Sequence, residues 1–271
     1  MGLSHSDHAK QRRTKAVSSV APSEFLLAER NSPLVKDALK TLLQNRPDLA
    51  SGEQATLASL MAGDETIDHQ GVRRLLDLGC GDGGAYDRLS KLFPSLDYHG
   101  LDIAESPEVM RRIREDLAFY EFDGVNIPFD SDTFDAIHCQ QVLEHVRYPD
   151  SLVAETSRVL KPGAWFMGSV SQLEPYHSRS IFNWTAYGIL QVFESHGFEV
   201  KRLAPGIDGV TLTLRRLFGP DKFRAFFSVE SLFNHFIDHQ YRISDKNRAE
   251  RSFLKLSCAG HIVFIAQKTP V

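Results

Sequence analysis

The sequence has few cysteines and no metal-type cysteine pairs. Its 271 residues include only Cys80, Cys139 and Cys258, which lie far apart and form no CxxC motif. This spacing predicts neither a disulfide framework nor a zinc cluster, so we expect no metal site. Three free cysteines fit a reducing compartment, and we expect a cytoplasmic protein.

The formal net charge is small, at -4, and the chain has no long apolar run. The balance of 31 Lys and Arg against 35 Asp and Glu argues against nucleic acid as the principal ligand. No stretch has the apolar length needed to span a bilayer, and the polar N-terminal residues lack the apolar core of a secretory signal. The opening MGLSHS fits the pattern for lipid modification at Gly2, but we expect a frayed polar tail.

The hydrophobic pattern divides the chain into five segments. The polar sequence of residues 1–22 predicts a disordered tail. Residues 23–70 predict a helical extension or cap, with one helix beginning near Pro33 and a second over Glu53 to Met61. The other segments are a core over residues 71–204, a helical insertion or lid over 205–258, and a last core strand with the C-terminus over 259–271.

Short β-like runs alternate with helical patterns from Val72 onward. They are RRLLDLG, LDYHGLDI, LAFYEFD, FDAIHCQ, AWFMGSV, FEVKRLA and HIVFIAQK. Strands alternating with helices form a mostly parallel sheet with helices on both faces. The sequence therefore predicts a Rossmann-like, doubly wound α/β fold with a seven-stranded sheet.

A glycine-rich turn follows the first of these strands. Gly79, Gly81 and Gly84 satisfy GxGxxG, and Asp102 lies at the end of the next strand, where an acid that binds ribose belongs. A buried strand that runs into such a turn presents backbone N–H groups to a ligand, and glycine lets the ligand approach the main chain. By itself this pattern also fits an NAD(P)-dependent oxidoreductase.

Four further motifs follow in order. Asp77 extends the turn to DxGxGxG, and it is followed by HGLDIA, FDGVNIPFDSDTFDAIHCQQVLEHV, RVLKPGAWF and a GF pair after a helix. From Leu75 to Leu203 this series resembles the class I S-adenosylmethionine-dependent methyltransferases, and most closely the subgroup that methylates small molecules. The resemblance implies S-adenosylmethionine as cofactor and O-methyl transfer to a sugar-, lipid- or polyketide-like acceptor. A protein that binds the cofactor without turnover remains an alternative.

The resemblance also implies which residues contact the cofactor. Asp77 orients the glycine loop and the methionine end, Gly79 and Gly81 lie beneath the ligand, and Asp102 binds both ribose hydroxyls. The other implied contacts are Ile103, Asp123 and Gly124 at the adenine, Gln140 near the methionine portion, Cys80 in the loop and His145 in the pocket wall. A reactive Cys80 thiol is left open.

The segment EPYHSRS after the fifth strand is the candidate source of a general base. We expect His177, with Tyr176 beside it, because histidine titrates near neutral pH and the segment follows the functional edge of the sheet. The alternative is a hydrogen-bonded surface histidine.

The insertion contains DKFRAFFSVESLFNHFIDHQ, whose apolar residues recur near helical spacing. We expect this aromatic face to pack as a lid over the substrate cleft, since aromatic stripes are usually buried. Contact of residues 221–239 with a membrane surface, or with a second subunit, is left open. The size of the insertion suits a bulky or lipid-linked acceptor.

Overall fold

The computed structural model describes residues 39, 52–62, 67–173, 179–219, 230–240 and 248–270. All of them belong to one compact unit, Ala38–Val271. The predicted tail and the predicted helix near Pro33 lie outside the described residues, apart from Leu39, which is helical and buried.

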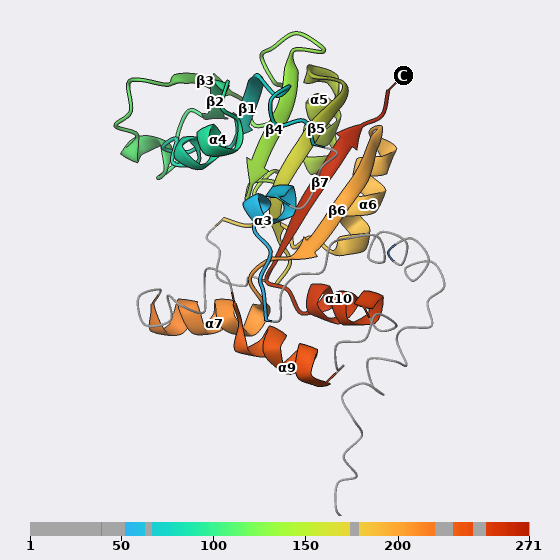
Figure 1. The fold of residues 1–271 in the computed structure, drawn as a ribbon. Helices are drawn as coiled ribbons and strands as arrows, with labels where there is room; N and C mark the ends of the chain where they lie inside the picture. The colour runs from blue at the N-terminus through green and yellow to red at the C-terminus, as the bar shows by residue number, and fades with distance from the viewer. Residues whose placement is uncertain are drawn as a thin grey trace, which may run out of the picture. The chain divides into compact units, whose positions relative to one another are not determined.

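Seven strands form one sheet in the order β3-β2-β1-β4-β5-β7-β6 (Figure 1). They are β1 Arg74–Leu78, β2 Asp97–Ile103, β3 Ala118–Phe122, β4 Phe134–Gln140, β5 Leu160–Ser171, β6 Phe198–Pro205 and β7 His261–Lys268. The pairs among β1 to β5 are parallel, and β7 runs antiparallel to both β5 and β6. The predicted Rossmann-like fold with a mostly parallel sheet is confirmed.

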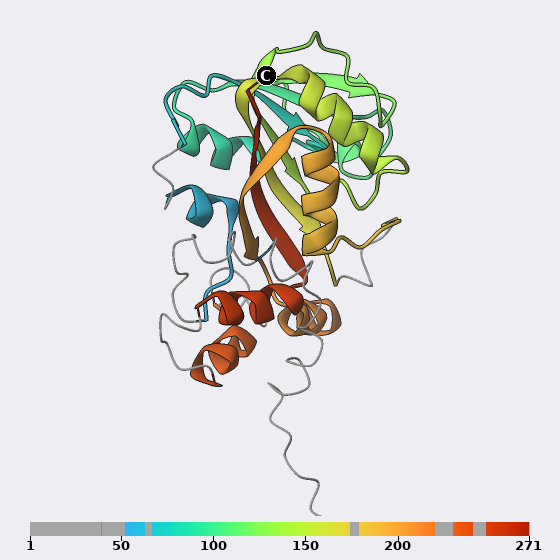
Figure 2. The ribbon, with the colours of Figure 1, turned by 90° about the vertical axis from the view of Figure 1, so that its right-hand side faces the viewer.

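Alternating side chains of β5 pack on the two faces of the sheet. Trp165 and Met167 join the cluster beneath α3 Leu57–Ala62 and α4 Tyr86–Leu92, whereas Phe166 packs on the opposite face. There its ring centroid lies 5.1 Å from that of Phe193 in α6 Ala186–Ser195. Helix α5 Pro149–Val159 covers the same face as α6 (Figure 2). Period-2 burial of large apolar side chains therefore places helices on both sides, as predicted.

Helix α3 begins at Leu57 and not at Glu53, so the predicted start of this helix is wrong. Glu53 instead forms an antiparallel bridge with Glu230. The Thr56 hydroxyl accepts a hydrogen bond from the Ser59 N–H at 3.0 Å, which caps the helix one residue before Leu57.

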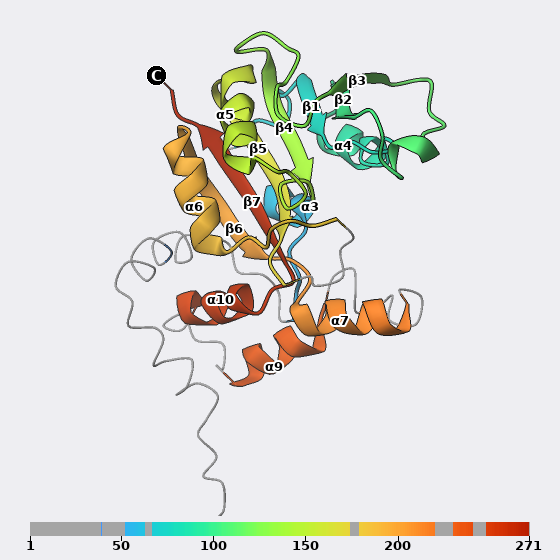
Figure 3. The same cartoon turned by 180° about the vertical axis from the view of Figure 1, so that it is seen from behind.

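The insertion between β6 and β7 contains three described helices, α7 Gly209–Phe218, α9 Leu232–Gln240 and α10 Arg248–Ser257 (Figure 3). It is joined to the segment that precedes α3. The Ser231 N–H donates to the Gly52 carbonyl at 2.8 Å, and the Asn234 amide donates to the Glu53 carbonyl at 3.0 Å. Gly52 and Glu53, from the described part of the predicted extension, are therefore bound directly to the insertion.

Helix α9 does not bury its apolar side chains in the predicted way. Its buried residues are Asn234, Ile237 and Asp238, whereas Leu232 is 68% and Phe236 50% exposed. Hydrogen bonds of Asp238 explain this orientation of the helix. Its Oδ2 accepts from the Gly52 N–H and from Lys255 Nζ, both at 2.7 Å. These contacts fix the rotation of α9 about its axis. The predicted buried aromatic face is thus wrong at Leu232 and Phe236.

The remaining aromatic positions of that prediction, Phe223, Phe226 and Phe227, lie outside the described residues. Among the helices that the structure does describe, none has the length and hydropathy required to cross a bilayer.

Candidate active site

The turn after β1 is a left-handed glycine bend. Gly79, Gly81 and Gly83 have φ values of 71°, 54° and 84°, which residues with side chains rarely adopt. A Cβ at Gly79 would also collide with the side chain of Val142. Gly84, the third glycine of the predicted pattern, has no positive φ, and its N–H donates to Asp82 Oδ1 at 3.0 Å. Gly79 and Gly81 are therefore required by the backbone conformation and, at Gly79, by the packing of Val142.

Both backbone polar groups of Gly81 are hydrogen-bonded to side chains, the N–H to Asp102 and the carbonyl to Arg112. Asp102 Oδ2 accepts from the Gly81 N–H at 2.7 Å, and Oδ1 accepts from the Ile103 N–H at 2.8 Å. Desolvation raises the pKa of the Asp102 carboxyl, although both backbone hydrogen bonds and the Arg112 charge oppose the shift. Arg112 donates to the Gly81 carbonyl at 2.7 Å, with its guanidinium 3.8 Å from the Phe119 ring centre. Sequence reasoning missed Arg112, which no motif marks.

Asp77 is a buried link between the strands before the bend. One carboxylate oxygen accepts a 2.6 Å hydrogen bond from the Tyr98 hydroxyl, and the other lies 2.6 Å from His138 Nδ1. All three side chains are buried. Because a carboxylate only accepts, His138 Nδ1 carries the proton in this contact. The network joins β1 to β2 and β4, and the sequence did not indicate Tyr98 or His138 as its members. The role of Asp77 in orienting the loop and the methionine end stays a prediction.

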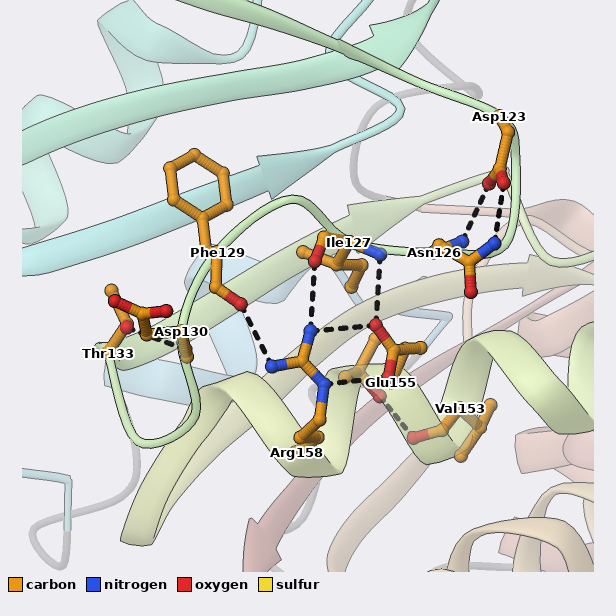
Figure 4. A network of polar contacts seen from close by, with 10 residues as sticks. Asp123, Asn126, Ile127, Phe129, Asp130, Thr133, Val153, Glu155 and Arg158 are labelled. Atoms are coloured by element: carbon orange, nitrogen blue, oxygen red, sulfur yellow. Dashed lines mark hydrogen bonds and ion pairs between the residues drawn. The ribbon is translucent and has the colours of Figure 1, made fainter.

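Ile103 and Gly124, both predicted at the adenine, lie side by side. A Cβ added at Gly124 would be 3.8 Å from Ile103 Cγ2, and Ile103 is 40% exposed. Asp123 caps the adjoining turn by accepting from the Val125 N–H at 2.9 Å. It also accepts from the Asn126 N–H at 2.7 Å, as Figure 4 shows. The hydrogen bond from the Asn126 side chain, followed by these backbone bonds, lowers the pKa of the Asp123 carboxyl.

The same turn is anchored to α5, as Figure 4 shows. Arg158 donates to the carbonyls of Ile127 and Phe129, both at 2.9 Å, and Glu155 accepts from the Ile127 N–H at 3.0 Å. Hydrogen bonding to Arg158 lowers the pKa of the Glu155 carboxyl, so the pair stays ionised. Two charged side chains thus fix the loop that carries Asp123 and Gly124.

Gln140 is exposed at the end of β4, and its Oε1 accepts from Arg88 Nη2 of α4 at 3.2 Å. The next residue, Gln141, has a φ of 57°, and its side chain bonds to the hydroxyls of Ser169 and Ser171 at 3.1 and 3.0 Å. His145 is half-buried in the following turn. Sequence reasoning placed Gln140 at this edge but missed Arg88.

The remaining predicted site residues are Cys80, which the structure describes, and His177 and Tyr176, which it does not. Cys80 is buried, and burial together with the Asp77 and Asp102 charges raises the pKa of its thiol, which disfavours the reactive-thiol alternative. His177 and Tyr176 lie outside the described residues. Within the described ranges, no group of three or more His, Cys, Asp or Glu side chains could hold a metal ion.

The bend and the strands around it lie in a segment with known relatives. Residues 76–168 match the family of the methyltransferase domain. The chain carries a class I methyltransferase domain. The predicted family is confirmed, and the oxidoreductase alternative is not retained.

The methyltransferase domain also has a close match among characterised proteins. It is 35% identical over 100 residues to the fatty-acid O-methyltransferase of Mycolicibacterium smegmatis. The match covers 35% of this chain and 36% of that protein, so the chain spans about a third of the relative's length.

Two crystal structures share the fold of the methyltransferase domain and its additions. One, assigned as a sarcosine dimethylglycine methyltransferase from Galdieria sulphuraria, has a TM-score of 0.55 at 18% identity and covers 79% of this chain and 84% of that chain. The other is the [4+2]-cyclase SpnF, with a TM-score of 0.51 at 20% identity over 88% of this chain and 93% of that chain. Since a cyclase shares it, the fold alone does not decide the reaction.

Proposed function

We propose that this protein is an S-adenosylmethionine-dependent methyltransferase that transfers a methyl group to an oxygen of a small, lipid-like acceptor. The observation that carries the proposal is the arrangement at the carboxyl edge of the sheet. A glycine bend with left-handed backbone lies next to Asp102, with the exposed Ile103 and the side-chain-free Gly124 beside it.

These residues fit the cofactor that the methyltransferase domain implies. Each Asp102 oxygen accepts one backbone N–H, and a carboxylate oxygen has two acceptor positions, so one on each oxygen remains for a ribose hydroxyl. Ile103 offers an exposed apolar surface for a planar base, and Gly124 adds no side chain that would block it. The carboxylates of Asp102 and Asp123 also suit a ligand that carries a sulfonium and an ammonium group.

When bound, the cofactor supplies a methyl group on a positively charged sulfur. The residues of the chain contribute alignment and exclusion of water. The acceptor must approach the methyl group in line with the sulfur, and the positive charge on that sulfur is lost during the transfer. A hydroxyl acceptor also gives up a proton, whereas a carboxylate is already ionised near neutral pH and needs no base. We assign uptake of the hydroxyl proton to His177 with Tyr176, since their segment follows β5, which ends at Ser171 on the same edge as Gln140.

The exposed apolar residues of the insertion favour a lipid-like acceptor. On α7 they are spaced at i, i+4, i+7 and i+8, which places them on one helix face: Val210, Leu214, Leu217 and Phe218. This helix contains Arg215 and Arg216 and no acid, which suits a carboxylate-bearing chain. The relative named as a fatty-acid O-methyltransferase agrees with this substrate class.

Two finer expectations belong to the same proposal. Contact of residues 221–239 with a membrane surface has support from the exposed Leu232 and Phe236, while residues 221–229 lie outside the described ranges. The cytoplasmic location rests on the free cysteines of the chain.

Calorimetry and a transfer assay test the proposed function together. We expect S-adenosylhomocysteine to bind and NAD not to bind, with Asp102→Ala weakening S-adenosylhomocysteine by about 10- to 100-fold. Labelled methyl groups should then pass to a fatty acid or a long-chain hydroxyl compound and not to a short polar analogue. Binding of NAD alone would overturn the proposal, and cofactor binding without transfer to any acceptor would favour the non-catalytic alternative.

A further inference from the structure

Arg88 brings a positive charge to the edge of the sheet where the methionine end of the cofactor is proposed to lie. It is in the first turn of α4, directly after the glycine bend, and its Nη2 donates to Gln140 Oε1 at 3.2 Å. Gln140 is the last residue of β4, the strand next to β1. The guanidinium therefore spans from the helix after the bend to the tip of the neighbouring strand.

The partner of Arg88 is neutral, unlike the partners of Arg111 and Arg114, whereas Arg112 already uses its guanidinium on the Gly81 carbonyl and the Phe119 ring. Arg114 forms ion pairs with Asp87 at 3.0 Å and Asp116 at 2.7 Å, and Arg111 pairs with Glu108 at 3.3 Å. Within the described residues, no carboxylate lies within ion-pair distance of Arg88, which is exposed. An arginine fork matches a carboxylate with two parallel hydrogen bonds, so a side-chain amide leaves most of its capacity unused.

The charges of the rest of the edge show what Arg88 is suited to bind. Asp102 and Asp123 are acids at this edge, and they suit hydroxyl, amine and cationic groups, whereas Asp77 is buried with both oxygens bound by Tyr98 and His138. The proposed cofactor also contains one anionic group, the α-carboxylate of its methionine portion, which none of these acids can accept. The adenine side is marked by Ile103 and Gly124, whereas Arg88 contacts Gln140 at the tip of β4.

We propose that Arg88 binds the α-carboxylate of the cofactor's methionine portion and exchanges its hydrogen bond to Gln140 for that ion pair. This assignment rests on the proposed function. It makes Arg88 the residue that distinguishes the complete cofactor from nucleosides that lack the amino acid.

Binding constants of two ligands test the assignment without any turnover. S-adenosylhomocysteine carries the carboxylate, and methylthioadenosine keeps the nucleoside and sulfur but lacks the amino acid. We expect Arg88→Ala to weaken S-adenosylhomocysteine by about 10- to 100-fold and methylthioadenosine by less than about twofold. Arg88→Lys keeps one charge without the fork and should give an intermediate loss.

Lys91→Ala is the matched control, because Lys91 is exposed on the same helix and carries the same charge. It should change neither binding constant by more than about twofold. Equal weakening of both ligands by Arg88→Ala, or no weakening of either, would overturn the assignment while leaving the proposed function intact. If the wild-type protein binds neither ligand, the proposed function fails and the assignment falls with it.

Discussion

Tyr98 and His138 bind the two oxygens of one buried carboxylate, since the Tyr98 hydroxyl and His138 Nδ1 each lie 2.6 Å from Asp77. Tyr98→Phe keeps the ring but leaves a charged, buried oxygen without its donor. We expect the free energy of unfolding to fall by about 1–3 kcal/mol, measured by urea denaturation. The affinity for S-adenosylhomocysteine should fall as well, because Asp77 adjoins the glycine bend.

Tyr148→Phe is the control for this substitution. The Tyr148 side chain is 61% exposed, so removal of its hydroxyl should change the unfolding free energy by less than about 0.5 kcal/mol. If Tyr98→Phe were as mild as Tyr148→Phe, the hydrogen bond from Tyr98 to Asp77 would not contribute to stability.

Asp102 makes cofactor affinity depend on pH. Desolvation raises the pKa of its carboxyl, so the free protein is protonated at a higher pH than an exposed aspartate would be. Ribose hydroxyls donate to the ionised form, and binding therefore releases the proton. Affinity for S-adenosylhomocysteine should be full above this raised pKa and fall as the pH drops through it, and titration calorimetry over a pH series measures the fall.

Asp102→Asn removes the titrating group and provides the control. The variant should bind S-adenosylhomocysteine about 10- to 100-fold more weakly, with little remaining dependence on pH over the acidic range. A wild-type profile that matches the variant's would show that another group is responsible. For the free protein the sign is opposite: a raised acid pKa means that this carboxyl's contribution to stability is lost as the pH rises through it.

Cys80 should be chemically inert in the folded protein. Its thiol is buried, and the charges of Asp77 and Asp102 add to the burial that raises its pKa. Thiol reagents near neutral pH should leave Cys80 unmodified until the chain is unfolded in urea, when all three cysteines react. Cys80→Ala should bind S-adenosylhomocysteine within about twofold of wild type. Rapid labelling of Cys80 in the native protein, with loss of binding, would contradict this.

The strands of the sheet were predictable because each is a short apolar run bounded by turn residues. β1 is buried from Leu75 to Leu78 and ends at the glycines, so both its length and its end can be read from the sequence. The acids at strand ends were placed by the same pattern. Parallel strands bring these ends to one edge, which is why Asp102 and Gly124 could be expected near each other.

Contacts that depend on rotation or on irregular segments were not predictable. Arg112 reaches Gly81 from the connection after β2, which has no regular period, and Arg88 meets Gln140 only because α4 packs at one particular angle. The rotation of α9 is set by the bonds of Asp238 to Gly52 and Lys255, which are far away in sequence. Helical periodicity shows which residues share a face, but not which face is buried.

The Asp238–Lys255 pair should be one of the most sensitive points of the insertion. Lys255 Nζ lies 2.7 Å from Asp238 Oδ2, and both side chains are almost fully buried. Lys255→Met keeps the apolar stem but removes one of the two positive charges paired with this buried carboxylate, the other being Arg251, whose Nε lies 3.3 Å from Asp238 Oδ1. We expect this change to lower the free energy of unfolding by about 1–3 kcal/mol in urea denaturation, because Asp238 loses a charged donor while Arg251 remains.

An exposed ion pair provides the comparison. Arg111 and Glu108 lie 3.3 Å apart with side chains 63% and 56% exposed, so Arg111→Met should cost less than about 1 kcal/mol. Under conditions where both variants are folded, Lys255→Met should retain S-adenosylhomocysteine affinity within about twofold, since Asp102 and the glycine bend belong to other elements. Equal losses of stability in the two variants would show that the insertion does not depend on this pair. Loss of cofactor affinity in the folded Lys255→Met variant would instead show that the insertion and the cofactor edge are coupled.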